Sequence, residues 1–399
     1  MPRDLPAPAA DLSLPALPRM PWALLAAACL GMFAASSSGT TRAPFLIDMA
    51  RDLDASLPMV ANLMAITSVA WGIASLLAGA GSDRWGRRPF LVGGPLALAA
   101  CMAGLSTSTG FAAAALWSAL AGACAGGFTG VLMAEASART VDRQRGRALG
   151  WVMAGQSLTL LVGVPLAAAI GTLVGWRGVN LCVAALAMLA AAMLFVTTLR
   201  PVDGPRRAGA PAPSLRAALS PRVLNLLAMG VAERICYGLT AVYFATFLQT
   251  TYGLSLGQVA LPLALFALGN IGGTVVGGQL ADRLRSRMLT FAAAMAASAG
   301  AALVLFGWTP GLVETVALGF GYVFLNAIAR PSLMAALANV PDEVRGTVLG
   351  LNVTSASLGW LGAAALGGWM MAQFGFAGFG PLTAGVALLG TGMAVIGRR

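Results

Sequence analysis

Long apolar segments recur along almost the whole chain and limit the folds open to it. A window of about 20 residues finds repeated, predominantly apolar stretches long enough to cross a bilayer as a helix. A soluble domain of 399 residues cannot bury a composition that is 58% hydrophobic and only 10% charged. The sequence therefore predicts an all-α polytopic membrane protein.

The predicted spans form two groups of six, separated by a hydrophilic stretch. Residues 200–222 contain five arginines and five prolines, a composition that suits a linker outside the membrane. Residues 1–21 are rich in proline and alanine, so we expect a disordered cytoplasmic tail. An N-terminal bundle is expected over 22–199 and a C-terminal bundle over 223–399. The spans are predicted at 22–43, 57–81, 89–108, 111–135, 146–173, 178–199, 223–249, 256–281, 287–307, 311–338, 346–373 and 376–396.

The positions of the basic residues predict the orientation of these spans. All 25 are arginines, and most flank the spans on the side that carries the linker and both termini. This bias predicts that the linker, both termini and the loop at 82–88 face the cytoplasm. The net charge of +11 is therefore a topology signal and not a nucleic-acid footprint. The exceptions are Arg42, Arg51, Arg177, Arg234 and Arg330, which lie within spans or on the opposite side.

Two short patterns occur once in each half of the chain. Gly79 with Asp83-Arg84 recurs 199 residues later as Gly278 with Asp282-Arg283, and Arg145-Gly146 recurs 200 residues later as Arg345-Gly346. Each pair falls between corresponding spans. The repeats predict a duplicated six-helix unit, which is typical of secondary transporters whose two halves enclose a central site.

The stretch at residues 79–89 carries a resemblance to a known family. Its spacing resembles the G-x-L-x-D-R-x-G-R-R signature between helices two and three of the major facilitator superfamily, with Gly81 in the usual place of leucine. The resemblance implies a cytoplasmic gate, with Arg139 as a possible partner of Asp83. The alternative is a charged loop that only obeys the positive-inside rule. The gate residues implied are Gly79, Asp83, Arg84, Gly86, Arg87, Arg88, Arg139, Asp282 and Arg283.

The fifth predicted span resembles the glycine- and proline-rich fifth helix of the twelve-helix drug:proton antiporter branch. Gly155, Gly163, Pro165 and Gly171 carry the similarity and imply a hinge, because proline lacks an amide donor and glycine allows close helix approach. The match is partial, since Val164 stands before Pro165. That branch also often has an arginine in span four, where this chain has Ser118.

Ionisable residues inside spans are the candidates for binding, because each costs about 2.5–3.5 kcal/mol to insert. Span seven contains Glu233-Arg234, Tyr237 and Tyr243. Glu233 and Tyr237 are four residues apart and share a helix face, whereas the adjacent Glu233 and Arg234 need not pair. Glu233 is either a cavity carboxylate that binds a cation or a proton, or part of a structural ion pair between the halves.

Two further groups of polar residues lie near span ends. Arg330 in span ten follows Asn326 by four residues, and it either binds an anionic substrate group or extends to the cytoplasmic surface. Glu135 and Arg139 lie one turn apart at the end of span four and are expected to form a surface pair.

The resemblance implies a secondary transporter of a bacterial inner membrane that exports small organic or drug-like molecules, driven by protons, through alternating access of the two bundles. An enzyme is not expected, because the chain has no histidine and no phosphate-binding loop of the G-x-x-x-x-G-K-[ST] type. No cofactor or metal is expected, and the partners are a small-molecule substrate, protons and the bilayer, with a functional monomer.

Two alternatives remain open. An importer or facilitator of a sugar or organic acid would use Arg330 and Arg234 as anion ligands. A membrane sensor with the same fold would bind a ligand without moving it.

Overall fold

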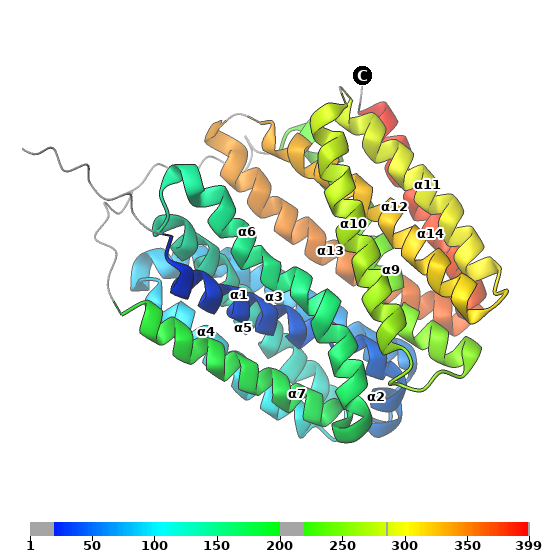
Figure 1. Ribbon diagram of the computed structural model, residues 1–399, viewed down its shortest axis with the longest axis horizontal. Coiled ribbons are helices and arrows are strands. Elements are labelled where there is room, and N and C mark those ends of the chain that lie inside the picture. The colour runs from blue at the N-terminus through cyan, green and yellow to red at the C-terminus, as the bar shows by residue number, and fades with distance from the viewer. Residues whose placement is uncertain (1–19, 200–218, 285, 341, 398–399) are drawn as a thin grey trace, which may run out of the picture.

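The computed structural model describes residues 20–199, 219–284, 286–340 and 342–397. The tail at 1–19, most of the predicted linker (200–218) and the last two residues lie outside this part. The helices are α1 (Trp22–Thr40), α2 (Leu46–Asp52), α3 (Leu57–Trp85), α4 (Arg88–Ser106), α5 (Phe111–Ala138), α6 (Asp142–Leu158), α7 (Val164–Thr197), α9 (Pro221–Tyr252), α10 (Ala260–Arg283), α11 (Arg287–Gly307), α12 (Leu312–Ala338), α13 (Asp342–Phe374) and α14 (Phe379–Ile396), shown in Figure 1.

Ten helical stretches of the described chain are long and apolar enough to cross a membrane. Two of them, 144–197 with 54 residues and 351–396 with 46, are each long enough for two spans. The first is divided at Gly175, where φ is 64°, and the second at Gly375, where φ is 60°. Only glycine adopts such angles without strain. Division at these glycines is consistent with the twelve predicted spans.

The predicted boundaries lie within a few residues of the observed helix ends, and the difference at residues 79–89 changes how that loop is interpreted. The span predicted at 287–307 coincides with α11. Helix α3 continues through Gly79 to Trp85, four residues beyond the predicted end. The chain turns at Gly86, where φ is 83°, so Gly79 is a helical residue and not a turn.

The helices pack in two groups with matching internal contacts (Figure 1). In the first half α3 packs on α5 and α4 packs on α7, and in the second half α10 packs on α12 and α11 packs on α14. Each contact in one half thus has a counterpart in the other, as expected for a duplicated unit. The two groups meet where α3 packs on α13 and α7 packs on α10.

We call the end of the bundles at which α7 ends and α9 begins the linker end, and the opposite end the far end. The groups are joined at the far end by polar and apolar contacts. The Gln249 amide donates a hydrogen bond to the Pro44 carbonyl at 3.0 Å, and the Leu256 side chain lies beside Gly171. Figure 1 shows α6 and α10 converging toward this end. The far end is therefore closed between the two halves.

Several glycines let paired helices approach so closely that a Cβ atom would overlap a carbonyl oxygen of the partner helix. A Cβ on Gly122 or Gly126 of α5 would overlap the carbonyl oxygens of Thr67 or Trp71 on α3. In the second half the glycines belong to the other member of the corresponding pair, α10, and a Cβ on Gly273 or Gly277 would overlap carbonyl oxygens of α12. Such contacts raise packing density where lipid provides no hydrophobic drive between helices.

The fifth predicted span, which comprises α6 and the start of α7, is interrupted before its proline. A π-helical turn, η2 (Thr159–Gly163), separates α6 from α7. Pro165 lies in the first turn of α7, where its missing N–H removes one helical hydrogen bond. A Cβ on Gly155 would overlap the Cys29 carbonyl of α1, and one on Gly171 would overlap the Phe45 ring. The predicted hinge residues therefore lie at an irregular helix that packs closely on α1 and on the turn that follows it.

The outer surface of the bundles is apolar. Leu173 is 86% exposed and Leu77 69% exposed. A soluble protein does not tolerate many such side chains, whereas the acyl chains of a bilayer cover them without cost. The structure thus supports the assignment as a multi-pass membrane protein.

Candidate functional site

A buried cluster of charge joins α9 and α12 in the second half. The Glu233 side chain is 1% exposed, and the Arg330 guanidinium donates to its Oε1 atom from Nη2 at 2.9 Å and from Nε at 3.2 Å. Arg234 Nε lies 3.5 Å from the other carboxylate oxygen, Oε2. The Arg330 guanidinium also lies over the Tyr237 ring, 5.2 Å from its centre. We call Glu233, Arg234, Tyr237 and Arg330 the Glu233 cluster.

The structure decides two open points about this cluster. Arg234 pairs with Glu233, because a long side chain can swing back toward its neighbour although their Cβ atoms diverge. Arg330 does not extend to the surface, since its side chain is 18% exposed and is held by Glu233. A carboxylate one helix away offers Arg330 a shorter path to a counter-charge than the membrane surface does.

Tyr243 and Asn326 lie apart from the cluster. The Tyr243 hydroxyl donates to the Ala364 carbonyl at 3.2 Å, and its ring packs edge-on against Phe379. The Asn326 amide lies 3.8 Å from the Met295 sulfur. Both residues thus pack inside the second half, and their role as proton or substrate candidates stays a prediction.

A small apolar cavity lies between the two halves beside the cluster. Its volume is about 30 Å³, which holds about two water molecules. We call it the central cavity. Its lining comes from both halves and comprises Thr40, Ala43, Met64, Leu160, Val164, Tyr237, Ala241, Leu263, Phe266, Ala267 and Trp360. Tyr237 therefore belongs to both the cavity wall and the Glu233 cluster.

The aromatic side of the cavity is preorganised. The Tyr237 ring stacks on Phe266 at 6.3 Å between centres and meets Trp360 edge-on at 5.8 Å. Rings held in this way present a flat, rigid surface to an aromatic or apolar molecule. A second cavity of about 10 Å³ borders Glu233, Arg234 and Arg330 and extends toward Asn352 and Ser355 of α13.

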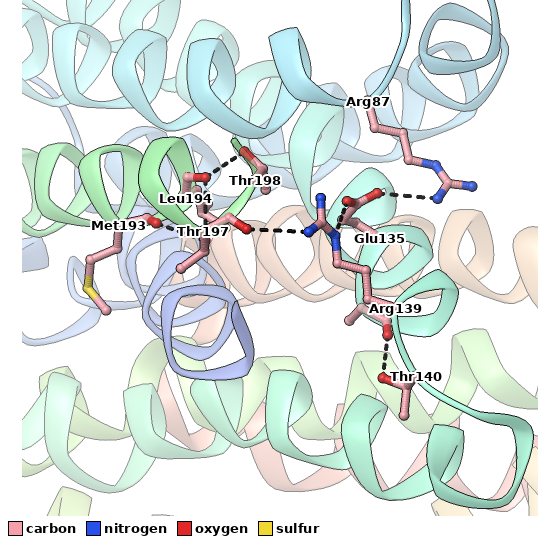
Figure 2. A network of polar contacts seen from close by, with 9 residues as sticks. Arg87, Glu135, Arg139, Thr140, Met193, Leu194, Thr197 and Thr198 are labelled. Carbon is pink, nitrogen blue, oxygen red and sulfur yellow. Dashed lines mark hydrogen bonds and ion pairs between the residues drawn. The ribbon is translucent and has the colours of Figure 1, made fainter. Parts of the chain in front are cut away.

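The polar contacts at the linker end centre on Glu135, a residue given only a surface role from the sequence. Its side chain is 7% exposed and accepts from Arg139 Nε at 2.6 Å and from Arg87 Nη1 at 3.3 Å. Arg139 also donates to the Thr197 carbonyl at 3.4 Å, which ties α5 to the end of α7 (Figure 2). The expected surface pair is therefore a buried carboxylate between two arginines.

The other predicted gate residues take varied positions. Arg88 lies over the Phe195 ring at 4.9 Å, and Arg84 lies over the Trp85 ring at 5.9 Å. Asp282 and Arg283 are exposed at the end of α10. The side chain of Asp83 lies outside the described part of the chain, so its pairing with Arg139 stays a prediction.

The fold and the cavity define a polytopic membrane protein whose two matched helical groups enclose a small central site. Residues 28–364 match the family model of the major facilitator superfamily. The chain therefore belongs to this superfamily of transporters, and the predicted resemblance is confirmed.

Several relatives are similar along most of their length. A chloramphenicol resistance protein of Streptomyces lividans is 26% identical over 356 residues, which cover 85% of this chain and 89% of the relative. The transcription regulatory protein OpdE of Pseudomonas aeruginosa is 28% identical over 359 residues, which cover 89% of this chain and 88% of the relative. The inner membrane transport protein YdhP of Escherichia coli K12 is 28% identical over 66% of this chain and 68% of its own.

Proposed function

We propose that the chain is a proton-driven exporter of small organic molecules in a bacterial inner membrane. The observation that carries the proposal is the central cavity, because both halves contribute to its lining and a change in their relative angle would expose it on either side. The similarity to a chloramphenicol resistance protein supports export over import. The arginine bias supports a cytoplasmic linker end.

The lining of the cavity favours a substrate with an aromatic or apolar body. Its wall is built from apolar side chains and from the rings of Tyr237, Phe266 and Trp360. Rings of this kind bind a flat apolar molecule through contact area at little conformational cost. The charged atoms of the Glu233 cluster lie behind Tyr237.

In this proposal Glu233 carries the proton. When the proton is absent, Arg330 and Arg234 balance the carboxylate charge within the membrane. When a proton binds, the neutral carboxyl loses its ion pairs with the two arginines, and the contact between α9 and α12 weakens. Span four has Ser118 at the position where the drug:proton antiporter branch often has an arginine. We therefore assign the proton to Glu233, which is buried behind Tyr237 of the cavity wall.

The test is uptake of radiolabelled chloramphenicol into everted membrane vesicles, with and without a pH gradient. Accumulation that needs the gradient is expected. Ala241→Trp would fill the central cavity and is expected to abolish it, whereas Ala113→Trp, on an exposed helix face, would leave it unchanged. Equal accumulation in both variants would refute a role of the cavity.

Two other functions have specific support. The Glu233 cluster holds two arginines for one carboxylate, which favours a transporter of an organic acid. Accumulation of benzoate, and not of chloramphenicol, would point to it. The similarity to a transcription regulatory protein supports a membrane sensor. A ligand that raises the thermal stability of the purified chain, yet is not moved into vesicles, would favour this role.

A further inference from the structure

An arginine at the far end is buried, and no described residue gives it an acidic partner. Arg42 follows the C-terminus of α1 and is 2% exposed, and among the described arginines it is the one that is fully buried. Its Nη1 atom donates to Thr67 Oγ1 at 3.1 Å and to Ser118 Oγ at 3.0 Å. Its Nε and Nη2 atoms have no hydrogen-bond partner among the residues that the structure describes.

The other arginine sites show how unusual this is. Arg177 pairs with Asp52, and Asp48 pairs with Arg51, so these far-end carboxylates are already used. In the described part of the chain no carboxylate lies within ion-pair distance of Arg42. The end of α1 contributes a partial negative charge, but a partial charge does not satisfy two buried N–H donors.

The unbonded atoms form one edge of the guanidinium group. The N–H bonds of Nε and Nη2 point the same way and are spaced to meet both oxygens of a carboxylate. The two hydroxyls hold Nη1, on the other side of the group, and so fix its orientation. The Thr67 hydroxyl donates to the Leu63 carbonyl at 2.9 Å, which directs its lone pairs to Arg42. The arrangement thus presents a preoriented bidentate donor.

The site adjoins the central cavity. Thr40 and Ala43, on either side of Arg42 in the chain, line that cavity, as does Met64, one turn before Thr67. A small molecule in the cavity therefore lies next to the wall segment that contains Arg42. Rocking of the two halves would separate this wall segment from α9, which contacts it through Gln249 and Pro44, and would widen the cavity beside it.

We propose that Arg42 is the binding site for one carboxylate group of a small organic molecule, held by the Nε–Nη2 edge. This inference rests on the geometry around Arg42 and is tested by binding, so it stands apart from the direction and energy source of transport. The bound carboxylate would remove the cost of an unbalanced buried charge.

The experiment is thermal unfolding of the full chain, purified in dodecylmaltoside and followed by tryptophan fluorescence. The probes are sodium benzoate, neutral benzamide and sodium chloride, at constant ionic strength. Benzoate is expected to raise the midpoint of unfolding, and benzamide and chloride are not. An equal rise with chloride would overturn the choice of a carboxylate, and no rise with benzoate would overturn the site.

Variants assign the effect to Arg42. Arg42→Gln, which can still bond both hydroxyls, is expected to lose the benzoate effect and to be more stable than the parent chain without ligand. If Arg42 had only a structural role, Arg42→Gln would be less stable than the parent chain. Arg42→Lys is expected to need about tenfold more benzoate, because one charge-assisted hydrogen bond is lost, and it serves if the glutamine variant does not fold.

Two arginine controls complete the design. Arg51→Gln changes a side chain that is 75% exposed at the same end of the molecule, and it is expected to respond to benzoate like the parent chain. Arg234→Gln changes the Glu233 cluster. A benzoate effect that is lost in Arg234→Gln but kept in Arg42→Gln would place the carboxylate in that cluster and overturn the inference.

Discussion

Replacement of Glu233 by glutamine tests whether the cluster is a structural ion pair or a working proton site. The change keeps the shape of the side chain but leaves Arg330 and Arg234 without a counter-charge. Glu233 is 1% exposed and Arg330 18% exposed, so solvent can restore little of the lost interaction. Removal of one partner of a buried pair costs about 3–5 kcal/mol, and we expect a value near the lower limit because glutamine still accepts a hydrogen bond.

The double variant separates the two roles. Arg330→Gln alone leaves Glu233 with Arg234 at 3.5 Å and is expected to cost about 1–3 kcal/mol. Glu233→Gln with Arg330→Gln removes both charges of the closest pair. Its cost is expected to fall below the sum of the single costs by about 1–3 kcal/mol, as for residues in direct contact.

Unfolding in detergent measures these differences, and vesicle uptake measures the function. Recovery of stability in the double variant without recovery of gradient-dependent uptake would mean that Glu233 is needed for coupling. Recovery of both stability and uptake would show that the cluster is only a structural ion pair. Glu314→Gln, at an exposed position of α12, is the control and should change stability by less than about 0.5 kcal/mol. Parent-like stability of Glu233→Gln would refute the reasoning.

Three further changes test other parts of the molecule. Asp83→Asn should strongly reduce transport while the amount of protein in the membrane stays constant; unchanged uptake rates would argue against a gate. Gly126→Ala should destabilise the chain by about 1–3 kcal/mol, because the new methyl group meets a backbone carbonyl, whereas Gly127→Ala meets no neighbour within 4 Å and should be neutral or stabilising; chemical denaturation would compare them. Glu135→Gln should cost about 3 kcal/mol in the same assay, and a loss below about 0.5 kcal/mol would show that its arginines are solvated instead.

The sequence predicted the architecture well because the bilayer imposes it. The length of each apolar segment, the arginines at segment ends and the repeated patterns depend on local composition and on chain order. These features placed the boundaries of α11 without any knowledge of packing. The π-helical turn before Pro165 was predicted only as a hinge, since proline marks the break but does not specify how the preceding turn adjusts.

The site was harder to predict because it depends on how each helix is rotated. A helix that is apolar on all sides gives no period from which its buried face can be derived. The four-residue spacing placed Tyr237 beside Glu233, but nothing local showed that Arg330 would reach them from α12 or that Tyr243 would face Phe379. Likewise, the hydroxyls that hold Arg42 come from α3 and α5, 25 and 76 residues away.

The glycine contacts of the two halves have a consequence for how the halves are compared. In the first half α5 supplies the glycines and α3 the carbonyls, and in the second half the counterpart of α3, α10, supplies the glycines. The two halves share the short distance between paired helices, and the glycines that permit it can belong to either helix of the pair. The atoms that approach each other are those of a glycine and of a backbone carbonyl group, so the same close distance is reached whichever helix of a pair carries the glycines. Comparison of the halves residue by residue would overlook this equivalence, whereas comparison of helix pairs reveals it.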